Sequence, residues 1–72
     1  MNKLNKVIIK VNGKKLILNP NSSVYDLINK LKLPINKVAI ELNKEIIDKK
    51  KLDNIILKSK DNIEIVHFIG GG

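Results

Sequence analysis

Residues 7–31 read VIIKVNGKKLILNPNSSVYDLINKL, and this stretch decides the fold because a hairpin is followed directly by an amphipathic helix. Apolar residues recur at every second position over 7–11, which predicts a strand with one buried face. Asn12 and Gly13 form the strongest two-residue hairpin signal, because a type I′ turn needs positive φ at both positions. Residues 14–18 are therefore predicted to return as a second, antiparallel strand.

A helix is predicted to begin after Ser23, because Ser23 and Asp26 resemble an N-terminal capping box. Four apolar residues then recur at i, i+3, i+4 and i+7, which places them on one helix face: Val24, Leu27, Ile28 and Leu31. The helix is expected to stop at Leu33 and Pro34, since the residue before a proline is pushed out of the α region. Its apolar face must be covered by a sheet.

The second half of the chain is predicted to be mostly extended. Alternating apolar residues predict strands over 38–42, 45–47 and 63–69, and the segment 48–60 is expected to be irregular, with one helical turn near 51–53. The order β-β-α-β-β-β with a single helix predicts an α+β protein of the ubiquitin-like β-grasp fold, a mixed sheet of four or five strands with the helix across it. The first and last strands are expected to be parallel neighbours.

One domain is expected over residues 1–69, followed by a flexible glycine tail at 70–72. Its predicted core consists of the inward-facing apolar residues of the helix and strands: Val7, Ile9, Val11, Leu16, Leu18, Val24, Leu27, Ile28, Leu31, Val38, Ile40, Leu42, Ile63 and Ile65. A core in a chain this short contributes only a few kcal/mol of net stability.

The composition argues against a nucleic-acid partner and against a membrane location. The 72 residues carry a formal net charge of +7, but all 14 cations are lysine, whereas arginine is favoured for phosphate and base contacts. Tyr25 and Phe68 are the only aromatic residues, so no stacking platform is evident. No run approaches the roughly 18 apolar residues that span a membrane, and no signal peptide is visible. A cytoplasmic location is expected.

The sequence also lacks the usual catalytic and metal-binding groups. It contains no cysteine and one histidine, His67, which cannot assemble a metal site alone. No phosphate-binding glycine loop and no Ser-His-Asp set are present. We therefore expect no enzyme activity and no cofactor bound by this chain, and a monomer when the protein is free.

Three glycines, Gly70, Gly71 and Gly72, end the sequence directly after an apolar strand. Glycine loses the most conformational freedom on folding, so a glycine run has no stabilising use there. Without a Cβ, however, it can thread a narrow channel and approach another molecule closely. A flexible tail that ends in a carboxylate indicates a substrate presented to another protein, although a frayed terminus or a cloning scar is the simpler alternative.

Two segments resemble the small sulfur carrier family of thiamine biosynthesis (ThiS). Residues 38–47, VAIELNKEII, resemble the family's V-A-V-x-x-N-G-E-I-V segment, and residues 61–72, DNIEIVHFIGGG, resemble its D-x-I-E-I-V-x-x-V-G-G-G ending. Ser23 and Val24 are similar to the start of the family's helix. The sequence departs from the family at Lys44, where a turn glycine is common, and at residues 48–49, where Pro-Arg is frequent.

This resemblance implies a carrier without a catalytic side chain. An E1-like adenylyltransferase (ThiF-like) that uses ATP and Mg²⁺ would adenylylate Gly72, and a sulfur donor such as a cysteine desulfurase would then convert the adenylate to a thiocarboxylate. The thiocarboxylate would deliver its sulfur to thiazole synthase (ThiG-like). Gly70 and Gly71 would form the unhindered tail.

The outward face of the sheet is predicted to be the docking surface for these partners. Strand alternation places five apolar residues on it, which we expect to form one patch: Ile8, Ile17, Ala39, Val66 and Phe68. Phe68, a large aromatic residue next to the tail, is the expected anchor.

Three alternatives remain open on the sequence alone. The small sulfur-carrier subunit of molybdopterin synthase (MoaD-like) has the same fold and ends in Gly-Gly, but it is usually longer and often has prolines before the glycines. A ubiquitin-like modifier would join its tail to lysines of other proteins. A binding module that carries no sulfur would end in glycines only incidentally.

Overall fold

The computed structural model describes residues 6–68, which form five strands, one α-helix and two 3₁₀ helices. In chain order these are β1 (Val7–Val11), β2 (Lys14–Leu18), α1 (Val24–Lys30), η1 (Ile35–Lys37), β3 (Val38–Leu42), β4 (Glu45–Ile46), η2 (Lys49–Asn54) and β5 (Asn62–His67). The hairpin turn forms as predicted, with positive φ at Asn12 (51°) and at Gly13 (85°).

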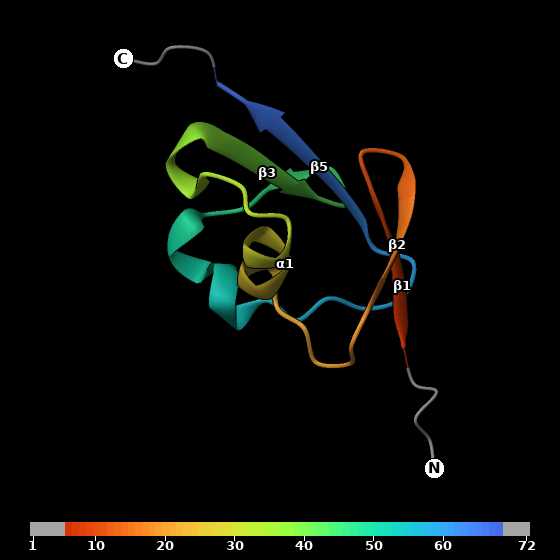
Figure 1. Cartoon of the computed structure of the whole chain (residues 1–72). Coiled ribbons are helices and arrows are strands. Elements are labelled where there is room, and N and C mark those ends of the chain that lie inside the picture. The colour runs from red at the N-terminus through yellow and green to blue at the C-terminus, as the bar shows by residue number, and fades with distance from the viewer. Residues whose placement is uncertain (1–5, 69–72) are drawn as a thin grey trace.

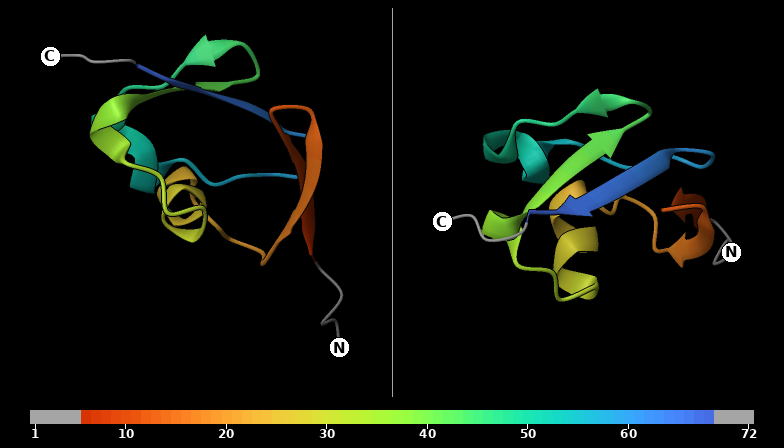
Figure 2. Two further views of the ribbon diagram at one scale, coloured as in Figure 1. Left: turned by 45° about the horizontal axis from the view of Figure 1, so that its top comes forward. Right: turned by 90° about the horizontal axis from the view of Figure 1, so that it is seen from above.

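The strands form a single mixed sheet in the order β2-β1-β5-β3-β4. Strands β1 and β5 are parallel, with Lys10 opposite Asn62 and Val11 opposite Ile63, and the other neighbouring strands are antiparallel. Both figures show the strands curving around α1, which lies on one side of the sheet (Figures 1 and 2). The predicted β-grasp arrangement, with the first and last strands adjacent, is confirmed.

Helix α1 begins with the predicted capping box. The Asp26 amide donates to Ser23 Oγ at 3.0 Å, and the Ser23 amide donates to Asp26 Oδ2 at 2.9 Å. The helix ends at Lys30, earlier than predicted. Lys32 adopts φ of 56° and its amide bonds to the Asn29 carbonyl, while the Leu33 amide bonds to the Ile28 carbonyl. These two hydrogen bonds form a Schellman motif. The helix is therefore ended by this C-cap and not by Pro34.

The buried core lies between α1 and the inner face of the sheet. Its buried members are Ile9, Leu18, Val24, Leu27, Ile28, Val38, Ile40, Ile47, Leu52, Leu57, Ile63 and Ile65. The predicted residues Val7, Val11, Leu16, Leu31 and Leu42 pack against this cluster but are only partly buried. The prediction missed Ile47, Leu52 and Leu57 because they lie in or beside the segment expected to be irregular. That segment contains η2, which packs beside α1 and closes the core.

A polar cluster joins the β3–β4 turn to the start of β5. Asn43 and Lys44 both have positive φ, at 51° and 74°, so the turn forms although lysine stands at the glycine position. Asn43 Nδ2 donates to Asp61 Oδ1 at 3.1 Å, and Asn43 Oδ1 accepts from the Asn62 amide at 2.9 Å. Asp61 is buried and also accepts from the Lys58 amide at 2.8 Å. The cluster gives these polar groups hydrogen-bond partners and connects the β3–β4 turn to the start of β5.

Within residues 6–68, no helix is long and apolar enough to cross a membrane. In the same part of the chain, no group of three or more His, Cys, Asp or Glu residues could hold a metal ion.

Candidate functional site

Strand β5 positions the base of the tail. It lies in the middle of the sheet between β1 and β3 (Figure 1), and the last described residue, Phe68, follows directly after it. The amide of Phe68, directly after β5, donates to the carbonyl of Lys37 at 2.8 Å, so the backbone is held up to this residue. Gly70, Gly71 and Gly72 lie outside the described residues, and the predicted mobility of the tail stays a prediction.

The Phe68 side chain combines exposure with a local contact. It is 50% exposed. The ammonium of Lys49, at the start of η2, lies 5.2 Å from the centroid of its ring, which is a cation–π contact. Lys49 was not identified from the sequence, because nothing local links residues so far apart in the chain. The contact favours one orientation of the Phe68 ring.

The apolar residues predicted on the outward face are exposed or half-buried. Val66 is opposite Ala39 on β3, and Ile8 is opposite Ile17 on β2. Ile8, Ile17 and Val66 are exposed, and Ala39 is half-buried. We call Ala39, Val66 and Phe68 the tail patch, and Ile8 with Ile17 the hairpin pair.

The expectation that these five residues form one patch is wrong. Ile8 lies two residues before Lys10, whereas Val66 lies four residues beyond Asn62, the residue opposite Lys10. The two groups are therefore offset by about 20 Å along the strands at the usual rise per residue. Alternation gave the correct face of each strand, but only the register between β1 and β5 gives their offset. Of the two groups, only the tail patch contains a residue, Phe68, that is close to the tail in the sequence.

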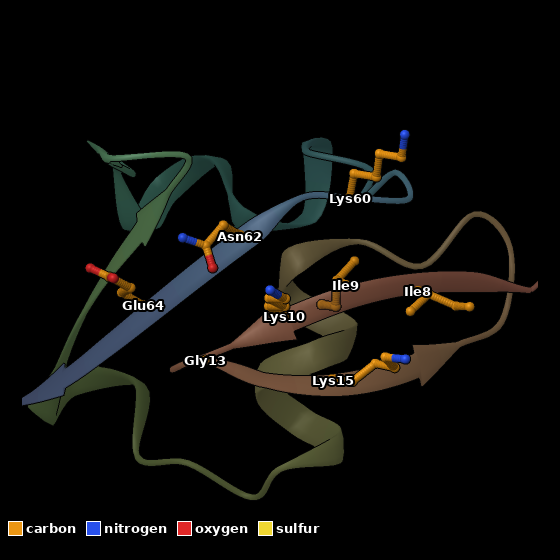
Figure 3. A pocket seen from close by; sticks show the side chains of 8 residues that line it. All are labelled: Ile8, Ile9, Lys10, Gly13, Lys15, Lys60, Asn62 and Glu64. Carbon is orange, nitrogen blue, oxygen red and sulfur yellow. The ribbon is translucent and has the colours of Figure 1, made fainter.

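A shallow hollow of about 580 Å³ lies beside Ile8 of the hairpin pair and extends to Glu64 of β5. The charged side chains lining it are Lys10, Lys15, Lys60 and Glu64, and Asn62 lies among them. Figure 3 shows Glu64 on the β3 side of the hollow and the lysines on the side of the hairpin and its neighbouring loop. The middle of the outward face is thus charged.

Sequence reasoning also missed an exposed apolar residue on the outer edge of the sheet. Ile46 on β4 is 75% exposed and lies opposite Glu41 of β3. Its strand has only two residues, Glu45 and Ile46, so the period-two pattern is too short to assign a face from the sequence. Ile46 extends the apolar surface around the Glu41 side chain.

A mixed five-stranded sheet in this order, with one main helix across it, defines the class of ubiquitin-like β-grasp proteins. Comparison with known proteins identifies the family within that class. The sequence model of the ThiS family matches residues 3–72. The chain belongs to the ThiS family.

Individual relatives agree with this assignment. The chain is 38% identical over 66 residues to the sulfur carrier protein ThiS of Bacillus subtilis (strain 168), covering 90% of this chain and 100% of the relative. A crystal structure of the thiamine biosynthesis protein ThiS from Geobacter metallireducens has a TM-score of 0.79 at 30% identity, covering 92% of this chain and 100% of that chain.

A third relative is a larger protein. The chain is 34% identical over 64 residues to a thiazole synthase of Magnetococcus marinus, covering 89% of this chain. The match spans only 20% of that synthase, so it concerns one segment of it.

Proposed function

We propose that this chain is the sulfur carrier protein of thiazole formation in thiamine biosynthesis. It is a carrier and not an enzyme. The observation that carries this conclusion is the match of the whole β-grasp domain and its glycine ending to the ThiS family, over residues 3–72. The similarity to a segment of a thiazole synthase supports the thiazole pathway.

The functional group in this proposal is the α-carboxylate of Gly72. With a pKa of about 3.5 it is ionised at neutral pH and is a poor electrophile, so it must be activated before it can accept sulfur. An E1-like adenylyltransferase would transfer AMP from ATP to the carboxylate, releasing pyrophosphate, with Mg²⁺ held by the enzyme. A persulfide, supplied by a donor such as a cysteine desulfurase, would displace AMP and become bonded to the Gly72 carbonyl through its outer sulfur. A thiol would then attack the new sulfur–sulfur bond and leave a thiocarboxylate on Gly72.

The domain contributes position rather than chemistry. The described backbone is tied to the sheet up to Phe68, where the last amide bonds to Lys37. Gly70, Gly71 and Gly72 then provide a segment without side chains, which suits a narrow active site. This division between an anchored base and an unhindered tip supports the proposal that a partner enzyme acts on Gly72, in the cytoplasm, where ATP is available.

We assign docking of the adenylyltransferase and of thiazole synthase to the tail patch. An exposed aromatic residue flanked by apolar neighbours is the usual composition of an interface anchor. Changing Phe68 to alanine should lower the affinity for either enzyme about tenfold or more, with little effect on unfolding because the ring is half exposed. Titration calorimetry with each purified enzyme measures this, and Tyr25→Ala, on exposed α1 surface, is the matched control. Unchanged affinity for both enzymes would remove the patch from the mechanism.

Mass spectrometry of the C-terminal peptide tests the carrier function directly. After incubation with the adenylyltransferase, ATP and a sulfur donor, one oxygen of Gly72 should be replaced by sulfur, and the product should support thiazole formation by the synthase. Deleting Gly72 should abolish the exchange while the domain stays folded.

Two outcomes would redirect the assignment. If no sulfur appears on Gly72, the carrier mechanism is wrong. If sulfur appears but only the large subunit of molybdopterin synthase accepts it, the chemistry stands and the pathway changes.

A further inference from the structure

Two pairs of like charges face one another across neighbouring strands of the sheet. Lys10 on β1 lies opposite Lys15 on β2, and Glu41 on β3 lies opposite Glu64 on β5. Like charges directly opposite in an antiparallel pair are destabilising. If one lysine and one glutamate exchanged places, each pair would contain opposite charges and would be attractive. The observed arrangement therefore does not stabilise the sheet.

Both pairs lie on the outward face. Ile9 and Ile40, which alternate with Lys10 and Glu41 on the same strands, are buried against the helix side. Lys10, Lys15 and Glu64 are exposed, and Glu41 is half-buried. The charges therefore meet solvent or a partner.

The two pairs belong to one surface. Lys10, Lys15 and Glu64 line the same hollow, together with Lys60, whose amide bonds to the Ile8 carbonyl at 2.9 Å. The lysines lie on the hairpin side and Glu64 on the β3 side (Figure 3). The outward face is thus cationic at Lys10 and Lys15, next to the hairpin pair, and anionic at Glu64 and Glu41. It is apolar again beyond the carboxylates, at the tail patch.

The carboxylate pair is unusual in this chain. It uses two of the seven acidic residues of a protein with a formal net charge of +7. Three other acidic side chains accept hydrogen bonds from backbone amides. Asp26 caps α1, Asp48 accepts from the Lys50 amide, and Asp61 accepts from the Lys58 amide. Glu41 and Glu64 lie on the open face instead, and each is close enough to the other to share one guanidinium group.

We propose that the outward face is a charge-matched docking surface whose partner places an arginine between Glu41 and Glu64 and a carboxylate over Lys10 and Lys15. The partner is the E1-like adenylyltransferase, so this inference rests on the proposed function. Apolar contact at the tail patch is non-directional. Two charge clusters of opposite sign fix one orientation, and that orientation directs the tail into the active site.

Charge reversal at each cluster tests this surface by titration calorimetry against the purified adenylyltransferase. The variant E41K/E64K and the variant K10E/K15E should each weaken binding at least tenfold. Asp53→Lys and Lys50→Glu, both on exposed η2 positions, reverse single charges away from the face and should change affinity less than twofold. Equal effects of face and control variants would overturn the proposal.

The quadruple variant K10E/K15E/E41K/E64K is the decisive member of the series. Its net charge equals that of the wild type, and each cross-strand pair remains a like-charge pair, so its thermal unfolding should match the wild type. The proposal requires that it bind at least tenfold more weakly, because the pattern is inverted. Wild-type affinity would mean that net charge alone steers the partner, and the proposal would be wrong.

Two further measurements separate this inference from the carrier function and from self-association. Deleting Gly72 should abolish sulfur transfer yet leave the affinity for the adenylyltransferase unchanged within twofold. A loss of transfer without a loss of affinity therefore concerns the tail and not the docking surface. If the adenylyltransferase binds no form of the chain, both proposals fail. Sedimentation of the free protein should show a monomer, and a dimer that the quadruple variant abolishes would assign the face to a second copy instead.

Discussion

At the scale of single residues, Asn12 performs two structural tasks. Its φ of 51° forms the hairpin turn, and its side chain replaces a missing strand beside β5. Asn12 Oδ1 accepts from the Ile65 amide at 2.8 Å, and Asn12 Nδ2 donates to the Ile65 carbonyl at 3.3 Å. The Asn12 side chain thus makes hydrogen bonds to β5 at a point beyond the end of β1, where no β1 backbone is left to make them.

Changing Asn12 to glycine should test the hydrogen bonds of the side chain, because glycine keeps the positive φ and has no side chain. Leaving the partly buried Ile65 backbone groups without these partners should cost about 1–3 kcal/mol of unfolding free energy. Urea denaturation measures this. Asn21→Gly is the control, since Asn21 is exposed with φ of 66° and should change stability by a few tenths of a kcal/mol. Equal stability of the two variants would contradict the role of the side chain.

At the scale of elements, the end of α1 contains backbone strain. Lys32 adopts φ of 56° in the Schellman motif, a conformation that costs a residue with a Cβ about 1–2 kcal/mol. Lys32→Gly should therefore raise the unfolding free energy by about 0.5–1 kcal/mol after allowing for the greater entropy of glycine in the unfolded chain.

Thermal unfolding followed by circular dichroism checks this gain. The matched control is Lys30→Gly, within the last turn of α1, which should instead lower stability by about 1 kcal/mol. A destabilised Lys32→Gly would show that the lysine side chain itself supports the helix end.

The 3₁₀ helix η2 contributes a buried side chain to the core. Leu52 is only 2% exposed and belongs to the core cluster. Leu52→Ala should cost about 2–5 kcal/mol, a large share of the stability of a domain this small. Lys50→Ala, exposed on the same element, should be nearly neutral in the same urea experiment. A cost below about 1 kcal/mol for Leu52→Ala would mean that η2 is dispensable for the core.

At the scale of the whole molecule, folding and sulfur transfer are expected to be separable. The described fold ends at Phe68, and the proposed reaction takes place on residues beyond it. Gly71→Val should leave the thermal unfolding temperature unchanged and abolish sulfur transfer, because a branched side chain would crowd a narrow active site. Calorimetry and the mass-spectrometric exchange assay test the two parts. Sulfur transfer at the wild-type rate would contradict the threading model.

Local patterns predicted most of the elements and the residues of the candidate site. The hairpin signal at Asn12 and Gly13, the capping box at Ser23 and the alternation along 63–69 depend on neighbours in the sequence, so they were visible there. The C-cap at Lys32 was missed because lysine rarely adopts positive φ. The helical turn predicted near 51–53 is present within η2. The sequence did not show that Ile47, Leu52 and Leu57 belong to the core, because these residues follow no single helical or strand period.

By itself the sequence determined the fold class, the inward and outward residues of every strand except β4, and the family, since periodicity and the glycine ending are properties of the chain. Only the tertiary structure decided how the outward residues are grouped. That grouping depends on the register of β1 against β5, with Lys10 opposite Asn62, two residues far apart in sequence that no local pattern connects. The register divides one expected apolar patch into two and places opposed charge clusters between them, because a shift along parallel strands moves every side chain on the face.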